Sequence, residues 1–117
     1  MNTPRAVGAG DAMSEAQLLT AVLAVLRRLP HVHGLRLNSG ATVIGEGASR
    51  RMIKGCEAGT PDVLVLLSGG RVVWLELKSP RGRIADSQSA WHAMAAKLGH
   101  RVVVCRDVQT AIDAVAA

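Results

Sequence analysis

Two apolar runs joined by a short glycine turn constrain the fold of this chain more than any other feature. Residues 63–67 read Val-Leu-Val-Leu-Leu, and residues 71–78 read Arg-Val-Val-Trp-Leu-Glu-Leu-Lys. Runs of this length, rich in Val and Leu and bounded by Gly, predict a β-hairpin. The connection Ser68-Gly69-Gly70 has a common hairpin length. Three ionisable groups stand at the far end of this hairpin, where burying an unpaired charge would cost several kcal/mol or more.

The length of the turn decides which of these charged side chains meet. With a three-residue loop, Asp62 lies directly opposite Glu76, with Cβ atoms about 4.5–5.5 Å apart. Because side chains alternate along a strand, Glu76 and Lys78 share one face while Leu77 points away. A two-residue Gly69-Gly70 turn would instead set Asp62 opposite Leu77, on the wrong face. The three-residue loop therefore predicts two carboxylates and one ammonium group on a single patch.

Two directly opposed carboxylates repel each other and destabilise a sheet. A divalent cation between them would turn that repulsion into binding, and oxygen ligands suit Mg²⁺ or Mn²⁺. The alternative is a salt bridge at the end of a sheet, in which Lys78 neutralises both acids, because charge clusters are often structural. The combined spacing favours the metal site.

The charge of the whole chain suggests a polyanionic partner. The 117 residues carry a net charge of +5. This balance suits nucleic acid or an anionic membrane surface, although a solvated basic face is the alternative. No apolar run approaches the ~18–20 residues that cross a bilayer, and Cys56 and Cys105 lack the spacing of a zinc site. The basic residues flank the predicted hairpin, at Arg50, Arg51 and Lys54 and at Arg81 and Arg83.

A chain of this length predicts one domain, which we place at residues 13–117 after a flexible tail at residues 1–12. The tail lacks the pattern of a signal peptide, and we expect an intracellular protein. Ser14 and Gln17 form a predicted capping box for a first helix that runs to about Leu29. Glu15 belongs to the predicted buried face and should point toward the sheet; the alternative is an acid that only complements the helix dipole. The apolar residues of that face are Leu18, Val22, Val25 and Leu29.

The rest of the chain predicts a mixed sheet with flanking helices. Residues 34–38 form a short strand, and residues 39–59 form a loop rich in Gly and bases, with a brief edge strand at 43–44. Asp86 or Ser87 caps a second helix that ends at Gly99. Residues 101–105 form a strand, and Asp107 caps a final helix. Because a strand reached through a helix usually runs parallel to the strand it left, the sheet is mixed.

A buried polar residue marks the second helix. Gln88 lies on the predicted apolar stripe, and a glutamine there needs a hydrogen-bond partner. A capping or surface role near the helix start is the alternative. The other residues of the stripe are Trp91, Ala95 and Leu98.

Five elements in this order resemble the VRR-NUC domain, a branch of the PD-(D/E)xK nuclease superfamily. They are Glu15, Arg36-Leu37-Asn38-Ser39-Gly40, Gly59-Thr60-Pro61-Asp62, Glu76-Leu77-Lys78 and Ser87-Gln88-Ser89-Ala90-Trp91. The resemblance covers about residues 14–107. The Val-Arg-Arg signature is absent, and the nearest text is Ser49-Arg50-Arg51. The chain resembles the stand-alone kind found in bacteriophages and prophages.

The resemblance implies a PD-(D/E)xK-like α/β fold and a Mg²⁺- or Mn²⁺-dependent DNA endonuclease. Asp62, Glu76 and the Leu77 carbonyl would bind the metal, and Glu15 would complete the shell directly or through water. Lys78 would act on the attacking water or the phosphorane, and Gln88 would hold Lys78 or the water. Implied contacts to the DNA backbone are Arg36, Asn38, Arg50, Arg51, Lys54, Arg81 and Arg83.

The stand-alone kind further implies a homodimer that acts on branched DNA such as four-way junctions, in the cytoplasm of a bacterium or of a phage-infected host. Two other functions stay open. One is a restriction-type endonuclease of the same superfamily, although a chain this short leaves little room for base recognition. The other is a catalytically idle DNA-binding or scaffolding module.

Overall fold

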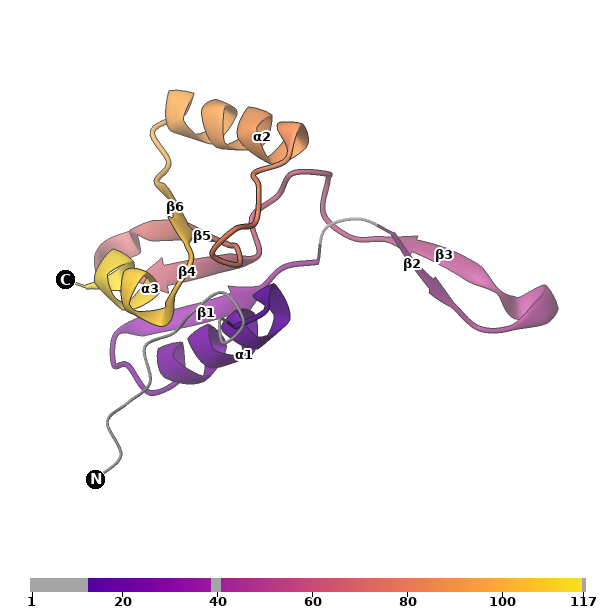
Figure 1. Ribbon diagram of the computed structural model, residues 1–117, viewed down its shortest axis with the longest axis horizontal. Helices are drawn as coiled ribbons and strands as arrows, with labels where there is room; N and C mark the ends of the chain where they lie inside the picture. The colour runs from indigo at the N-terminus through magenta and orange to yellow at the C-terminus, as the bar shows by residue number, and fades with distance from the viewer. Residues whose placement is uncertain (1–12, 39–40, 117) are drawn as a thin grey trace.

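A four-stranded mixed sheet organises the chain, for which the computed structural model describes residues 13–38 and 41–116 (Figure 1). The strand order is β1-β4-β5-β6, with β1 antiparallel to β4, β4 antiparallel to β5, and β6 parallel to β5. This arrangement confirms the predicted mixed α/β sheet. The predicted tail at residues 1–12 lies outside the described residues. The strands are β1 (Val32–Arg36), β4 (Val63–Leu67), β5 (Val72–Leu77) and β6 (Val102–Cys105).

The β4–β5 hairpin has the predicted register. Val63 pairs with Leu75, and the Leu67 N–H donates to the Arg71 carbonyl at 2.8 Å. Residues Ser68–Gly70 form the short turn η2, in which both glycines have positive φ. The register continues to Asp62, which therefore stands opposite Glu76.

The hydrophobic core lies between one face of the sheet and two helices, α1 (Glu15–Leu26) and α3 (Val108–Val115). Alternate side chains of β4 and β5 point into it, as strand geometry requires. Asp107 caps α3 as predicted, accepting from the Thr110 N–H at 2.7 Å. The buried members of this core are Leu18, Val22, Leu26, Val63, Val65, Val73, Leu75, Leu77, Cys105, Ala111, Ala114 and Val115.

Helix α1 begins as predicted and ends earlier. The capping box of Ser14 and Gln17 is present, with bonds of 2.9 and 3.1 Å. The helix ends at Leu26 rather than at Leu29, because the Arg28 and Leu29 N–H groups bond to carbonyls three residues back. Such bonds tighten the last turn of a helix. Leu26 is consequently buried, whereas Val25 is only half-buried.

Helix α2 (Asp86–Lys97) packs on the other face of the sheet. Its Trp91 ring meets Trp74 of β5 edge to face, with ring centroids 4.8 Å apart. Ala95 is buried as predicted, but Leu98 is 68% exposed and the prediction for it was wrong. Successive helical residues are rotated by about 100° around the helix axis. Measured from Gln88, Leu98 therefore lies about 80° around the helix in one direction, and His92 lies about 40° around it in the other direction. The stripe that faces the sheet therefore runs through His92 and Ala95.

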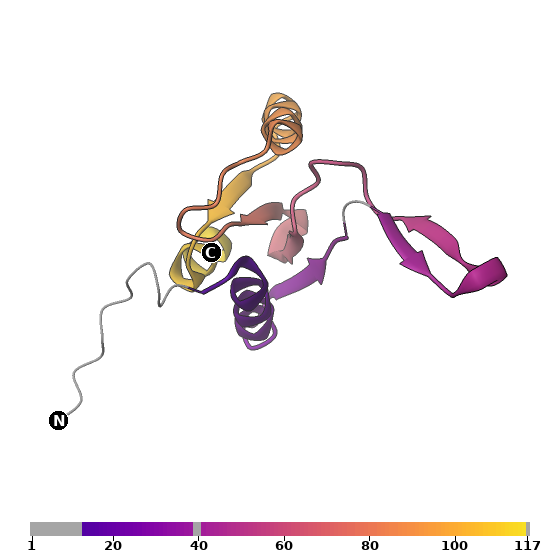
Figure 2. The ribbon, with the colours of Figure 1, turned by 45° about the vertical axis from the view of Figure 1, so that its right-hand side comes forward.

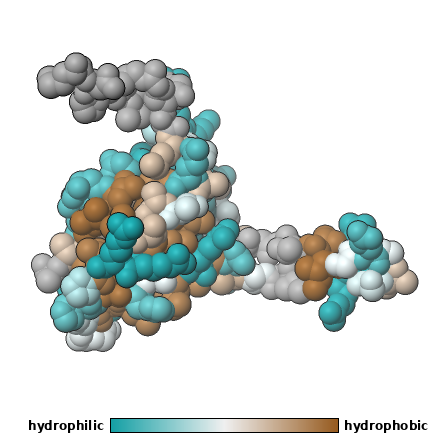
Figure 3. All heavy atoms as spheres, turned by 90° about the horizontal axis from the view of Figure 1, so that it is seen from below, coloured by the Kyte–Doolittle hydropathy of each residue, from teal (hydrophilic) through white to brown (hydrophobic). Residues whose placement is uncertain are grey.

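The segment predicted as a long loop forms a second, two-stranded sheet. Strands β2 (Ala41–Ile44) and β3 (Arg51–Lys54) pair antiparallel and are joined by the 3₁₀ turn η1 (Gly47–Ser49). We call residues 41–54 the arm. It projects away from the body of the molecule and presents both hydrophobic and hydrophilic surface (Figures 2 and 3). In the described part of the chain, no helix is long and apolar enough to cross a bilayer.

Candidate active site

Five segments converge at one end of the main sheet. The start of α1, the end of β1, the start of β4, the end of β5 and the start of α2 all lie there, and the arm leaves from the same end (Figure 1). This convergence follows from the topology, because antiparallel neighbours bring the start of β4 beside the end of β5. Asp62, Glu76, Lys78 and Gln88 come together at this end, whereas Arg50 and Arg51 lie on the arm that projects away from it (Figure 1).

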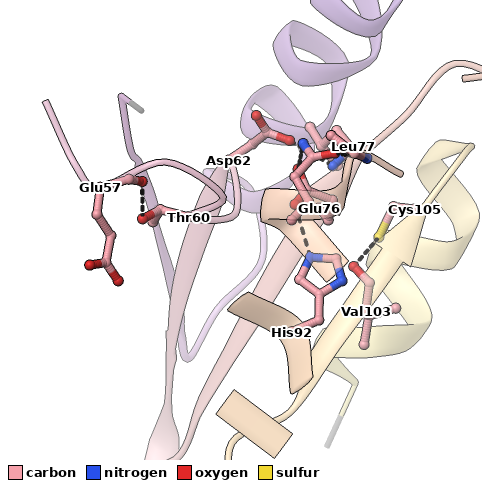
Figure 4. Close-up of polar contacts among 10 residues, drawn as sticks. Glu57, Thr60, Asp62, Glu76, Leu77, His92, Val103 and Cys105 are labelled. Atoms are coloured by element: carbon pink, nitrogen blue, oxygen red, sulfur yellow. Dashed lines mark hydrogen bonds and ion pairs between the residues drawn. The ribbon is translucent and has the colours of Figure 1, made fainter. Parts of the chain in front are cut away.

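Asp62 is held immediately before β4. Its Oδ2 accepts a hydrogen bond of 2.8 Å from the Leu77 backbone N–H (Figure 4), and its carbonyl accepts one from the Leu37 N–H at 2.8 Å. The side chain is thus tied to the next strand and the backbone to β1. Asp62 and Glu76 therefore meet across the hairpin as the register predicts.

A glycine allows the loop before Asp62 to touch helix α2. Gly59 has φ +91°, and a Cβ atom there would lie 2.2 Å from the Ser87 carbonyl oxygen. Only a residue without a side chain permits this approach. One residue further on, the Thr60 hydroxyl donates to the Glu57 carbonyl at 2.7 Å and closes the turn (Figure 4). The Gly-Thr-Pro-Asp segment thereby fixes the start of α2 relative to the acids.

Glu76 is the most enclosed charged residue of the site, with 1% of the residue exposed. Its Oε1 lies 2.9 Å from Nε2 of His92 (Figure 4). Its Oε2 accepts a hydrogen bond of 3.3 Å from Gln88 Nε2. Gln88 Oε1 in turn accepts from the Ala85 N–H at 2.9 Å. Gln88 therefore joins the start of α2 to Glu76, and each carboxylate oxygen of Glu76 has a partner on α2.

The start of α2 differs from the prediction. Ala85 is the N-cap residue, and neither Asp86 nor Ser87 caps the helix. The side chain of Gln88 supplies the missing cap by accepting the Ala85 N–H. Gln88 thus takes part in the start of α2, and its Nε2 contacts Glu76, whereas the sequence pointed to Lys78 or the attacking water as its partner.

The electrostatic environment raises the pKa of Glu76 to about 8. Burial is the largest cause, followed by the hydrogen bond and the charge of Asp62. Lys78, itself only 8% exposed, lowers the Glu76 pKa, while the charge of Glu15 raises it further. Burial, and then the positive charge of Lys78, lower the pKa of His92. Burial therefore disfavours the charged forms of both Glu76 and His92.

Glu15 occupies the first turn of α1 and is exposed, so the prediction that it belongs to the buried face of the helix was wrong. The negative charge of Glu15 nevertheless raises the pKa of Glu76. Within residues 13–38 and 41–116, no three Asp, Glu, His or Cys side chains gather into a ready metal cluster. The side-chain donors are the two carboxylates of the hairpin. Mg²⁺ usually keeps several waters and is held by one or two carboxylates, so this donor set, with the Leu77 carbonyl, fits such an ion.

The predicted DNA-contacting residues are divided between this end of the sheet and the arm, which projects away from it (Figure 1). Arg36 and Asn38 are exposed at the end of β1 and just beyond it. Arg50 and Arg51 are exposed on the arm. Lys54 belongs to β3. Arg81 and Arg83 are exposed in the loop that follows Lys78.

Two residues of the site were missed by sequence reasoning. His92 follows Gln88 by four residues, a spacing that places both on one face of a helix and could have revealed it. No spacing or motif in the sequence pointed to Arg106. Its Nη1 donates to the carbonyls of Ser79 and Gly82 at 2.8 Å and of Pro80 at 3.3 Å. Arg106 thus organises the loop that carries Arg81 and Arg83.

Three comparisons with known proteins agree with this geometry. The sequence profile of the VRR-NUC domain matches residues 36–109. A protein of Acyrthosiphon pisum secondary endosymbiont phage 1, named "Putative nuclease p44", is 31% identical over 71 residues, which cover 59% of this chain and 76% of the phage protein. A solved structure described as a VRR_NUC domain superposes with a TM-score of 0.60 at 20% identity, covering 86% of this chain and 94% of that one.

Proposed function

Since this chain belongs to the VRR-NUC family of nuclease domains, we propose that it is a Mg²⁺- or Mn²⁺-dependent endonuclease that hydrolyses phosphodiester bonds in DNA. One observation carries the proposal. The hairpin register brings Asp62 opposite Glu76, with Lys78 beside them, at the end of the sheet from which the arm leaves (Figure 1). Burial and the neighbouring acids disfavour the ionised form of Glu76, and a divalent cation would favour it.

The residues have separable roles in this proposal. Asp62, Glu76 and the Leu77 carbonyl hold the metal, and Glu15 reaches it through water. When bound, the metal polarises the scissile phosphate and supplies hydroxide near neutral pH. Lys78 orients the attacking water and offsets negative charge at the phosphorus. Gln88 holds the Glu76 carboxylate and the start of α2 together.

Basic side chains around the site would bind the phosphate backbone. Such contacts position DNA without reading its sequence. Binding should weaken steeply with salt, because each neutralised phosphate releases counterions. The residues proposed for these contacts are Arg36, Asn38, Arg50, Arg51, Lys54, Arg81 and Arg83.

We further infer a homodimer that resolves four-way junctions in the bacterial or phage-infected cytoplasm. One catalytic patch cuts one strand, whereas a junction requires two symmetric cuts that a two-fold dimer provides. The arm supports this inference, because it carries apolar side chains into solvent: Met52 is 66% exposed, Val43 44% and Ile44 39%. A second copy of the chain would cover them.

Cleavage assays on linear, nicked, flap and four-way DNA test the proposal. Wild-type protein should cut with Mg²⁺ or Mn²⁺ and not with EDTA, and four-way DNA should be cut fastest. Asp62→Asn and Glu76→Gln should abolish cutting, whereas Glu46→Gln, at an exposed acid of the arm, should not. Wild-type rates in both site variants would refute the nuclease site. Equal cutting of linear and four-way DNA would refute only the junction preference.

A further inference from the structure

His92 contacts the site without belonging to any motif that pointed to it. Its ring projects from α2 toward β5, and Nε2 lies 2.9 Å from Glu76 Oε1 (Figure 4). The His92 side chain is 18% exposed and that of Glu76 is 1% exposed. A hydrogen bond between such enclosed groups restricts both side chains, because few other orientations satisfy the carboxylate.

The contact controls which lone pairs of Glu76 remain free. A carboxylate offers two acceptor positions on each oxygen. His92 takes one on Oε1 and Gln88 takes one on Oε2. One position on each oxygen is left, and both partners come from α2. The two bonds therefore limit how the Glu76 carboxylate can turn relative to α2.

We propose that His92 is a positioning residue of this nuclease site, whose Nε2 holds the Glu76 carboxylate in the orientation that binds the metal. This proposal rests on the proposed function, because it assigns Glu76 as a metal ligand. Hydrogen bonds from outside a metal's own ligand shell orient the ligands, and their removal typically costs about 10–100-fold in affinity or activity. The competing role is a structural brace that only fastens α2 to the sheet.

Side-chain geometry separates these two roles. The contact uses Nε2, so the amide nitrogen of Gln at position 92 reaches nearly the same point, whereas the shorter Asn corresponds to Nδ1 and falls short. We therefore compare His92→Gln, His92→Asn and His92→Leu, with His100→Leu as control at an exposed histidine. Each full-length variant is measured for Mn²⁺ affinity by calorimetry, for cleavage rate, and for thermal unfolding without metal.

His92→Gln should stay within about threefold of wild type in Mn²⁺ affinity and cleavage, and His92→Asn and His92→Leu should lose about 10–100-fold in both. The control should match wild type. Wild-type Mn²⁺ affinity in His92→Leu would overturn the proposal. The proposal would also be overturned if all three variants lost Mn²⁺ affinity and cleavage equally, in parallel with their loss of thermal stability. These results differ from failure of the proposed function, in which wild-type protein itself neither binds Mn²⁺ nor cuts DNA.

Discussion

Replacement of Glu76 by Gln should stabilise the metal-free protein, and only at neutral and alkaline pH. The reason is the position of Glu76, whose burial and proximity to Asp62 raise its pKa from the ordinary value of 4.5 to about 8. A carboxyl group with a raised pKa in the folded state binds more protons there than in the unfolded chain. The free energy of unfolding therefore falls as pH rises through this window.

The size of the effect follows from the two pKa values. One pKa unit corresponds to about 1.4 kcal/mol, so the raised Glu76 pKa sets an upper limit of about 5 kcal/mol on the stability lost between pH 4.5 and about 8. Relaxation and water entry reduce this figure. A neutral amide of nearly the same size escapes the loss, so the two proteins should differ little near pH 5 and by several kcal/mol near pH 9.

Urea unfolding in EDTA across this pH range provides the assay. The difference between Glu76→Gln and wild type isolates Glu76, because other titrating groups are common to both proteins. Glu46→Gln, at an exposed acid, should parallel wild type throughout. Excess Mg²⁺ should then stabilise wild type and leave Glu76→Gln nearly unchanged, because a ligand that binds only the folded state stabilises it. A constant difference between Glu76→Gln and wild type at all pH values would refute the reasoning.

Three further perturbations follow from the contacts around the site. Gly59→Ala should destabilise the protein by roughly 1–3 kcal/mol and slow cleavage, because its Cβ atom would meet the Ser87 carbonyl. The control Gly69→Ala, where φ is also positive but the space is open, should lower the free energy of unfolding less in urea and leave cleavage unchanged. Equal losses of stability in the two variants would contradict the steric argument. Arg106→Lys should speed hydrogen exchange at residues 79–83 roughly fivefold, since a hydrogen bond contributes about 1 kcal/mol; unchanged exchange would show that the loop holds itself. Met52→Glu should dissociate the proposed dimer, as measured by light scattering, and leave thermal unfolding of the monomer unchanged. Leu98→Glu, at another exposed apolar residue, should leave the dimer intact. A Met52→Glu protein that remains a dimer would exclude the arm as the interface.

The central hairpin could be predicted because the residues that determine its register are close together in the sequence. The Ser68–Gly70 turn sets the register, and strand alternation then decides which side chains meet. The arm could not be predicted in the same way. In the described part of the chain its strands are four residues each, pair only with each other, and are joined by a connection in which Gly45 and Gly47 have positive φ. Segments this short carry little periodicity, so a Gly-rich sequence predicts a loop.

The contacts of α2 show a second limit of sequence reasoning. A polar residue on an apolar stripe needs a partner, which points to Gln88, but the predicted stripe of Gln88, Trp91, Ala95 and Leu98 includes the exposed Leu98 and leaves out His92. The true orientation depends on how α2 meets β5, where Trp91 packs against Trp74 and His92 reaches Glu76. This orientation is a tertiary property. Arg106 is a similar case, since its three carbonyl partners lie more than twenty residues away in the chain.

The electrostatic repulsion between Asp62 and Glu76 destabilises the metal-free protein, and the proposed metal ion would relieve the same repulsion when it binds. A domain of this size has a free energy of unfolding of about 5–15 kcal/mol, so it can tolerate only a limited electrostatic penalty in the metal-free state. Lys78 reduces the penalty at Glu76, whereas Glu15 increases it through its charge. A residue whose only role is to complement a helix dipole need not stand near a buried carboxylate. Glu15 is exposed in the first turn of α1 and its charge raises the pKa of Glu76, which accords with the proposed role of Glu15 in reaching the metal through water.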